Sequence, residues 1–454
     1  MSITSTALTV AGFDPSGGAG LQVDLKTFSA YEVNGKSVAT SITIQNTAGV
    51  RDVYDIPCKV VEQQLSAILE DGKPNAVKTG MLGNESIVEI VVRLFRHHRI
   101  KNLVVDPVIR SSSGKSLLSA KGVEALKKKL LPIALLVTPN LSEAEILSGI
   151  KVHKASDRIR AARALLKLGA KKVLIKGGHL RGTPQDFFFD GKRTLLFDSS
   201  RIVGGDIHGT GCTFASAITA GLAKGKDIVT SVKEAKGFIG LAIAGAVRSG
   251  KGVPQTEPLT GLYQNSERYN MCERVIRAIE VLQNSCIGGL IPEVQSNIGF
   301  GLENARTLDD VIGFPARIVK CGKDILVPVP PRFGGSRHVA DIVLTVMRFD
   351  PSKRAVMNIK YNADLIKICK SLKFSLGSFD RAIEPKKVKS LEGSSLEWGT
   401  AFAIQKCGFV PDIVFDTGGM RKEEMIRVIA EDIESLMDKI LKIHQGYLKF
   451  LRKN

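Results

Sequence analysis

A glycine-rich stretch near the middle of the chain, from Gly204 to Gly225 (GGDIHGTGCTFASAITAGLAKG), has the residue types and spacing of an anion-binding turn. Glycines at 209 and 211 permit backbone conformations that a Cβ forbids, and from Thr213 the sequence becomes small and apolar, as in a tightly packed helix. Unpaired N–H groups at such a helix start can hold an anion, and the helix dipole adds to the attraction. Gly209–Cys212 is therefore a candidate anion hole for a phosphoryl group, with a merely close-packed turn as the alternative.

Charged side chains stand at the ends of several expected strands. Asp106 ends the apolar run 103–106, and Lys176 ends the run 173–176. Open α/β sheets bind ligands at the carboxyl ends of their strands, so both residues are candidates for a site, although a lone lysine is more often a solvated charge. Asp24 lies beside the helical stripe of Leu21, Leu25 and Phe28, where an acidic residue is often only a partner of the helix dipole.

These residues require an alternation of strands and helices in the first half of the chain. The expected strands are 7–11, 38–44, 103–106, 134–138 and 173–176, with a further strand that is left by the segment 77–82; each is followed by a helical or loop segment. Such alternation predicts an α/β domain with a largely parallel sheet covered on both faces. Ser142 and Glu145 have the spacing of a capping box for the helix that follows the fifth strand.

Composition narrows the classes of protein. With 454 residues and 44% hydrophobic residues, two or three domains with proper cores are expected. The net charge of +19 invites a nucleic-acid interpretation, but no recognition motif supports it, and some of the charge suits phosphorylated substrates. The seven scattered cysteines indicate neither a disulfide framework nor a zinc site. No secretory signal or membrane-length apolar run is apparent, so a cytoplasmic protein is expected.

The segment 250–265 is rich in glycine, proline and polar residues and is interpreted as a domain boundary. We expect a first domain over 1–255, a linker over 256–266 and a second, smaller α/β domain over 267–454. The second domain should begin with a helix from Glu267 to about Gln283, because Met271, Val275, Ile279 and Leu282 share one face.

Gly209-Thr210-Gly211-Cys212, together with GFDPSGGAGLQVDLKTF near the N-terminus, resembles the hydroxymethylpyrimidine and hydroxymethylpyrimidine-phosphate kinases of thiamine synthesis. These kinases are a branch of the ribokinase-like superfamily, and the resemblance covers roughly the first 255 residues. It implies a three-layer α/β/α fold with a mostly parallel sheet, and ATP and Mg²⁺ as co-substrate and cofactor.

The resemblance also concerns Cys212. Most of the superfamily has an aspartate there, which serves as base toward the substrate hydroxyl, whereas the pyrimidine-kinase branch shares the cysteine. A free thiol titrates near pH ~8.5, and a helix N-terminus is expected to lower its pKa. We therefore assign Cys212 a catalytic role, with site shaping as the alternative. The role of His208 stays open.

Further roles follow from the resemblance alone. Asp24 matches the residue that holds the hydroxymethyl end of the pyrimidine, Gln45 the amide that reads its ring, and Met81 a residue that lines the pocket; Gly12 and Val108 are assigned to the same pocket. Asp106 and Glu143 match metal ligands. Lys176 matches the residue that neutralises the nucleotide phosphates, and Asn140 and Thr210 are assigned to nucleotide binding.

The second half resembles the archaeal-type thiamine-phosphate synthase domain, over roughly 267–441. In that family, positions matching Arg317 and His338 belong to the active site; Asn297 and Asp380 are weaker candidates. An arginine fork suits a diphosphate, and a histidine can donate to the same group. Asp416-Thr417-Gly418-Gly419 precedes an expected amphipathic helix near 421–441 and is interpreted as a second anion site or a helix cap.

The hypothesis is a bifunctional enzyme. The first domain phosphorylates hydroxymethylpyrimidine and its phosphate, and the second joins the diphosphate to thiazole phosphate, releasing pyrophosphate. Two alternatives stay open: another vitamin kinase such as a pyridoxal kinase, or a second domain that only senses thiamine phosphate. The expected partners are small-molecule substrates and a second copy in a homodimer, with neither nucleic acid nor a membrane.

Overall fold

The computed structural model describes residues 4–111, 114–177, 185–198, 206–385, 394–419 and 422–452. Gly204 and Gly205 of the glycine-rich stretch lie outside these ranges. The chain divides into two compact units, Met1–Tyr263 and Gln264–Asn454, and each is described by itself. In the part of the chain that the structure describes, no helix is long and apolar enough to cross a membrane.

The first unit is built on a nine-stranded sheet in the order β3-β2-β1-β4-β5-β6-β7-β8-β9. Its strands are β1 (Thr6–Phe13), β2 (Asn34–Asn46), β3 (Gly49–Asp55), β4 (Ala76–Thr79), β5 (Leu103–Val105), β6 (Leu136–Val137), β7 (Val173–Ile175), β8 (Gln185–Phe189) and β9 (Thr194–Asp198). Strands β2, β1, β4, β5, β6 and β7 run parallel, and β3, β8 and β9 add antiparallel edges. The central strands are apolar because both faces are covered.

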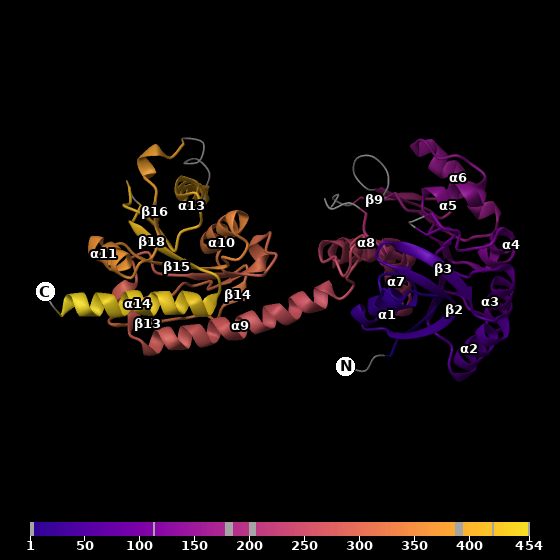
Figure 1. The fold of residues 1–454 in the computed structure, drawn as a ribbon, viewed down its shortest axis with the longest axis horizontal. Coiled ribbons are helices and arrows are strands. Elements are labelled where there is room, and N and C mark those ends of the chain that lie inside the picture. The colour runs from indigo at the N-terminus through magenta and orange to yellow at the C-terminus, as the bar shows by residue number, and fades with distance from the viewer. Residues whose placement is uncertain are drawn as a thin grey trace. The chain divides into compact units, whose positions relative to one another are not determined.

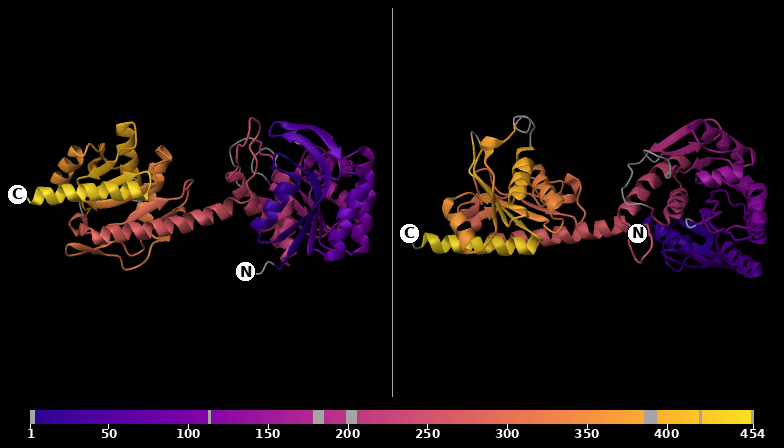
Figure 2. Two further views of the ribbon diagram at one scale, coloured as in Figure 1. Left: turned by 60° about the horizontal axis from the view of Figure 1, so that its bottom comes forward. Right: turned by 45° about the horizontal axis from the view of Figure 1, so that its top comes forward.

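Helices pack on both faces of this sheet (Figures 1 and 2). One core joins the sheet to α2 (Cys58–Asp71), α3 (Glu85–His97), α4 (Ala120–Ala125), α5 (Leu141–Ser148) and α6 (Ala155–Lys167). The other joins it to α1 (Gly20–Ala30), α7 (Thr210–Ala223) and α8 (Ile228–Ala244). The predicted three-layer α/β/α architecture with a mostly parallel sheet is therefore confirmed.

The second unit has a seven-stranded sheet in the order β14-β11-β10-β15-β18-β17-β16, in which β16 and β17 are the parallel pair. The strands are β10 (Ile298–Gly301), β11 (Val311–Gly313), β14 (Arg332–Phe333), β15 (Ala355–Lys360), β16 (Leu376–Ser378), β17 (Ile413–Asp416) and β18 (Met425–Ala430). A separate hairpin pairs β12 (Val319–Cys321) with β13 (Asp324–Leu326). The predicted second α/β domain is thus present, with a mainly antiparallel sheet.

The helices of this unit also form two layers. One core contains residues of α9 (Thr260–Asn284), α11 (Ala363–Ser371) and α14 (Ile433–Leu451), and the other contains residues of α10 (Arg337–Phe349) and α13 (Ser394–Cys407). Two sequence expectations differ from this. Helix α9 begins at Thr260, inside the expected linker, and the helix expected near 421–441 is replaced by strand β18 and then α14. The 425–430 segment MIRVIA is buried throughout, which favours a central strand over an amphipathic helix.

Candidate active sites

The loop after β1 is organised by the buried carboxylate of Asp14. Its Oδ1 accepts hydrogen bonds from Ser16 N (2.8 Å) and Ser16 Oγ (2.7 Å), and its Oδ2 accepts from Gly18 N (3.1 Å) and Ala19 N (2.8 Å). Burial raises the pKa of Asp14, but hydrogen bonds from His208, Gln45 and Ser16 outweigh it and hold the pKa well below its usual value. Asp14 is therefore a carboxylate, and it fixes the path of the DPSGGAG loop.

This loop meets the glycine turn at Gly209, the N-cap residue of α7. Gly209 has φ +85°, and a Cβ there would stand 1.8 Å from the carbonyl oxygen of Gly18. Only glycine satisfies both conditions. The two glycine-rich segments, about 190 residues apart in the sequence, therefore pack backbone against backbone, and their contact fixes where α7 begins.

Gly211, two residues later, faces the strand ends. A Cβ at this position would lie 3.2 Å from Lys176 Nζ and 3.9 Å from Asp106 Oδ2. The start of α7, the residue after β7 and the residue after β5 therefore converge at the carboxyl edge of the sheet. The structure brings together three groups that the sequence singled out separately: the turn that contains Thr210, Lys176 and Asp106.

Asp106 and Lys176 form a nearly buried ion pair with Nζ 2.7 Å from Oδ1, and Thr138 Oγ1 donates to the same oxygen over 3.1 Å. Burial acts to lower the pKa of Lys176, but the carboxylates of Asp106 and Glu143 raise it above its usual value. Lys176 is therefore a fixed cation. The pKa of Glu143 is raised to about 7, mainly because the carboxyl group is buried. Lys176 opposes this rise and the Asp106 carboxylate adds to it.

Asn140 and Glu143 form the capping box at the start of α5. Asn140 Oδ1 accepts from Glu143 N (2.9 Å) and Glu143 Oε2 accepts from Asn140 N (2.8 Å). The box expected from Ser142 and Glu145 is therefore wrong. Glu145 instead accepts from Val152 N. The helix starts at Leu141, so the N-cap is Asn140 and the N3 residue is Glu143.

Cys212 lies in the first turn of α7, where we expected the helix dipole to lower its pKa. Instead, the pKa of the thiol is raised to about 11, mainly by burial. The carboxylates of Asp24 and Asp106 add to this rise, and the Lys78 cation opposes it. The expected lowering of the thiol pKa is therefore corrected: desolvation and the carboxylates of Asp24 and Asp106 outweigh the nearby Lys78 cation.

The carboxylate of Asp24, which the resemblance assigns to substrate binding, is surrounded by protein donors. Its side chain has no exposed surface and accepts hydrogen bonds from Lys78 Nζ (2.7 and 2.9 Å), Thr9 Oγ1 (2.6 Å) and Ser216 Oγ (2.6 Å). The oxygens of Asp24 are thus occupied by protein donors, and the substrate contact that the resemblance implies stays a prediction. Helical spacing alone could not distinguish this buried position on α1 from an exposed one.

The remaining pocket candidates lie around the ends of β1, β2 and β4. A Cβ on Gly12 would come within 3.0 Å of Met81 Sδ, so these two residues are in contact. Gln45 is partly buried near the end of β2 and hydrogen-bonds to Asp14, while Val108 N donates to the carbonyl of Asp106 (2.9 Å). Four sequence candidates therefore border the same carboxyl edge of the sheet.

Some residues at this site were missed from the sequence. The segment after α8 returns to it: Gln255 Nε2 donates to Ser16 Oγ (3.0 Å), and the hydroxyls of Thr256 and Thr213 lie 3.0 Å apart. His208, whose role the sequence leaves open, lies here too, with Nε2 3.4 Å from Asp14 Oδ2. The sequence assigns Gln255 and Thr256 to the domain boundary, because nothing in this polar segment indicates a contact with residues near the N-terminus or on α7.

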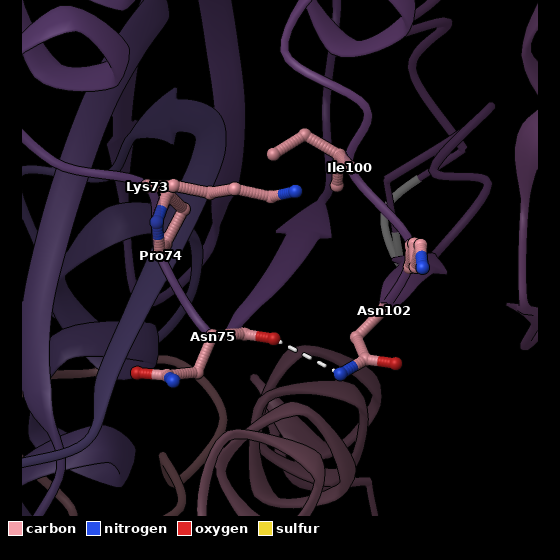
Figure 3. A pocket seen from close by; sticks show the side chains of 6 residues that line it. Lys73, Pro74, Asn75, Ile100 and Asn102 are labelled. Atoms are coloured by element: carbon pink, nitrogen blue, oxygen red, sulfur yellow. Dashed lines mark hydrogen bonds between the residues drawn. The ribbon is translucent and has the colours of Figure 1, made fainter.

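A separate hollow of about 270 Å³ lies at the opposite edge of the sheet, before β4 and β5 (Figure 3). It is lined by Lys73, Pro74, Asn75, Ile100, Lys101 and Asn102. Its polar groups bond to one another, as where Asn102 Nδ2 donates to the Asn75 carbonyl (3.0 Å), or to nearby backbone, as where Lys73 Nζ donates to the Arg99 carbonyl (2.7 Å). None of the candidate site residues lines it.

In the second unit, Arg317 and His338 are exposed and stand on two segments that pack together. Arg317 follows β11 with φ +63°, and its guanidinium donates to the Val294 carbonyl. His338 lies in the first turn of α10. A Cβ on Gly335 would meet the Gly313 carbonyl at 2.3 Å, so the segments carrying the two candidates are in contact.

The weaker candidates of this unit serve the fold. The Asn297 amide pairs with both the N–H and the carbonyl of Phe314, and Asp380 caps a short helix. Asp416 is fully buried between two arginines, accepting from Arg381 Nε (2.6 Å) and Arg427 Nη1 (2.9 Å). Its carboxylate also accepts from Gly418 N (3.0 Å), so it shapes the turn rather than facing solvent.

A parallel sheet between two helix layers, with a glycine turn beside a lysine and a carboxylate at the strand ends, defines the first unit as a ribokinase-like small-molecule kinase. Comparison with known proteins agrees. Residues 14–257 match the phosphomethylpyrimidine kinase family, and residues 274–442 match the thiamine-phosphate synthase ThiN family. The chain therefore belongs to the family of bifunctional thiamine biosynthesis proteins that carry a kinase domain and a ThiN synthase domain.

Individual relatives support this membership. The chain is 34% identical to the bifunctional thiamine biosynthesis protein ThiDN of Methanocaldococcus jannaschii, over 97% of this chain and 98% of that protein. It is 44% identical to the hydroxymethylpyrimidine/phosphomethylpyrimidine kinase of Aquifex aeolicus, over 54% of this chain and 97% of the relative. Among solved structures, a Bacillus subtilis pyridoxal kinase in an ADP complex matches with a TM-score of 0.53 and 36% identity, over 56% of this chain and 98% of that one.

Proposed function

We propose that the first unit uses ATP to phosphorylate hydroxymethylpyrimidine and then its phosphate. The second unit then joins the resulting diphosphate to thiazole phosphate, giving thiamine phosphate and pyrophosphate. The observation that carries the kinase assignment is the placement of Gly211 against Lys176 and Asp106. Relatives of the same fold were solved with ADP and with AMP-PCP, which supports ATP as co-substrate.

The backbone N–H groups of Gly209–Cys212 form the anion hole for the transferred phosphoryl group. They lie at the N-terminus of the 14-residue helix α7, where the N–H groups lack helical partners. Lys176 supplies a positive charge beside them and neutralises the nucleotide phosphates, with Asn140 and Thr210 bordering the same space. In phosphoryl transfer such positioning and charge neutralisation supply most of the rate enhancement.

Asp106 and Glu143 would hold Mg²⁺. Two carboxylates at one strand edge suit this hard cation, and Asp106 raises the pKa of Glu143, so a cation between them would relieve their repulsion. Among the described residues no group of three or more metal-binding side chains is present, so nucleotide oxygens and water would complete the coordination. The bound ion would neutralise charge on the phosphates.

Cys212 contributes its backbone N–H and the shape of its side chain. With a thiol pKa of about 11 it is neutral at physiological pH and is not a base. The pyrimidine would lie beside Gly12, Met81, Val108 and Gln45, whose amide offers a donor and an acceptor to an aminopyrimidine.

In the second unit, Arg317 binds the diphosphate, and His338 donates to that group or to the thiazole phosphate. The reacting carbon is a benzylic-like methylene, so charge builds up on the departing pyrophosphate. Their exposure at the junction of two packed segments leaves both side chains accessible to a charged substrate.

We also propose a homodimer through the face of β2 and β3. Ile42, Ile44 and Tyr54 are each more than 40% exposed, and Ile42 pairs with Tyr54 across the two strands. Such an apolar edge favours association. Light scattering of the wild type should report a dimer, and Ile44→Lys should shift it toward the monomer.

The decisive experiment is mass spectrometry after incubation of the purified chain with hydroxymethylpyrimidine, MgATP and thiazole phosphate. Thiamine phosphate is the expected product. Diphosphate without thiamine phosphate would leave the kinase in place and favour a sensor role for the second unit. No phosphorylation would remove the kinase assignment.

A pyridoxal kinase activity is a second candidate, because the matching structures from Bacillus subtilis and Staphylococcus aureus are of pyridoxal kinases at 36% and 37% identity. Parallel assays with pyridoxal and hydroxymethylpyrimidine decide between them. We expect the pyrimidine to have the higher kcat/KM, as the family match indicates.

A further inference from the structure

Lys78 and Asp24 form a fully buried ion pair that the proposed mechanism does not use. Both side chains have 0% exposure, and Lys78 Nζ contacts both carboxylate oxygens, at 2.7 and 2.9 Å. Burial acts to lower the pKa of Lys78, but Asp24, Cys212 and Asp106 raise it above its usual value, so the lysine is cationic. A buried ion pair contributes little net stability because desolvation offsets the attraction. We therefore consider whether the ion pair fixes the geometry of the kinase site.

The pair lies within a polar layer between the sheet and two helices. Lys78 on β4 is the register partner of Thr9 on β1, and both side chains reach Asp24 on α1. The fourth member is Ser216 on α7, whose Oγ donates to Asp24 Oδ1 over 2.6 Å. One carboxylate thus joins two strands, α1 and α7 in a region that otherwise packs through apolar side chains.

The connection to α7 bears directly on the anion hole. Ser216 lies one helical turn after Cys212, so the two side chains share a face of the helix. A shift of Ser216 along the helix axis would move the N–H groups of Gly209–Cys212 relative to Lys176, because the helix is a rigid element. On the strand side, Lys78 Nζ lies 3.0 Å from where a Cβ on Gly80 would stand, just before the pocket residue Met81.

We propose that Lys78 is a positioning residue of the kinase reaction. By holding Asp24 as a fixed acceptor, it sets, through Ser216, the distance between the N-terminus of α7 and the strand ends that carry Asp106 and Lys176. This inference rests on the proposed anion hole. The effect belongs to the transition state, where the donors must match a planar phosphoryl group, rather than to the binding of nucleotide.

The test compares isosteric variants of the full-length chain. Lys78→Met removes the cation, and Thr9→Val removes one hydroxyl donor to Asp24. Thr27→Val is the matched control: Thr27 is also fully buried, but its hydroxyl donates to the Val23 carbonyl of its own helix (2.7 Å). Calorimetry would measure the affinity for ADP alone and for ADP with aluminium fluoride, Mg²⁺ and hydroxymethylpyrimidine, which imitate the transferring phosphoryl group.

Lys78→Met and Thr9→Val should weaken the aluminium fluoride complex by about tenfold or more, leaving the affinity for ADP within about threefold and Thr27→Val unchanged. Calorimetry also reports the number of binding sites per chain. A variant that is partly unfolded would bind with reduced stoichiometry, which distinguishes unfolding from a weakened aluminium fluoride complex. If Lys78→Met does not fold, Thr9→Val still decides.

Gly211→Ala separates this inference from the proposed function. If Gly211→Ala weakens the fluoride complex while Lys78→Met and Thr9→Val bind it as the wild type does, the anion hole stands and the positioning role of Lys78 is wrong. If Gly211→Ala binds it normally, the anion hole itself is wrong, and the positioning role falls with it.

Discussion

Lys176 Nζ lies 2.7 Å from Asp106 Oδ1, although strand β6 separates their strands in the sheet. The contact passes over the end of β6, where Thr138 donates to the same carboxylate oxygen. A lysine and an aspartate that are far apart in the sequence thus meet beside Gly211. The ion pair therefore places a fixed cation and a carboxylate at the N-terminus of α7, where the glycine turn begins. The predictions for the kinase follow from this arrangement.

Gly211→Ala should lower kcat of the kinase by about 100-fold, because its Cβ would lie 3.2 Å from Lys176 Nζ and displace the ammonium from the phosphoryl site. Steady-state kinetics with hydroxymethylpyrimidine and ATP measures this. Gly237→Ala is the control. Gly237 lies on α8 with nothing within 4 Å of its Cβ position, so the alanine should stabilise the helix by about 0.5–1 kcal/mol and leave kcat unchanged. Equal kcat for both variants would contradict the role of Gly211.

Cys212→Ala should keep kcat within about tenfold of the wild type, because a thiol whose pKa is about 11 is protonated across the working pH range and cannot act as base. The pH profile of kcat/KM between pH 6 and 9 should have the same shape in both proteins. A basic limb that is present in the wild type and lost in Cys212→Ala would instead show that the thiolate takes part.

Asp106→Asn should raise the Mg²⁺ concentration required for half-maximal kinase activity by about tenfold, and it should also lower kcat because Lys176 loses its charged partner. Activity measured against free Mg²⁺ at saturating ATP separates the two effects. Asp71→Asn serves as control, since its carboxylate is 82% exposed and forms a 3.4 Å ion pair with Lys36, and neither is a candidate site residue. Removal of Mg²⁺ with a chelator should abolish activity in all three proteins.

Arg317→Gly should abolish condensation without destabilising the second unit. Arg317 has φ +63°, a region where glycine is not strained, so the substitution removes the guanidinium while relieving the backbone. Mass spectrometry should show the pyrimidine diphosphate accumulating. Lys373→Gly is the matched control: φ is +61° at this exposed position, so the same relief should occur with condensation retained. Condensation by Arg317→Gly at the wild-type rate would exclude the arginine from the site.

Asp412→Asn should destabilise the second unit in a pH-dependent way. Burial acts to raise the pKa of Asp412, but Lys439 and Ser375 outweigh it and lower the pKa to about 2. A depressed pKa gives stability that is present above the unfolded value near pH ~4 and is lost as the pH falls toward ~2. The cost should be about 2 kcal/mol at neutral pH and near zero at about pH 2. Urea unfolding followed by fluorescence of Trp398, the single tryptophan, measures it within this unit. A cost that does not change with pH would contradict the assignment.

Local patterns in the sequence were sufficient for the architecture of the first unit and for the position of its site. Glycines at 209 and 211 predict a tight turn, and apolar runs ending in Asp106 and Lys176 predict strand ends. Parallel strands place their carboxyl ends at one edge, so these signals predict one site without knowledge of any contact. The three-layer fold and the family followed from the same segments.

The tertiary structure decided the chemical state and the partners of individual groups. The pKa of Cys212 depends on burial and on charged groups from other segments, which spacing along the helix does not show. Asp24 accepts hydrogen bonds from Lys78, Thr9 and Ser216, because three distant elements close over it. Local spacing is encoded over a few residues and can be read from the chain, whereas desolvation and long-range pairing exist only once the chain has folded.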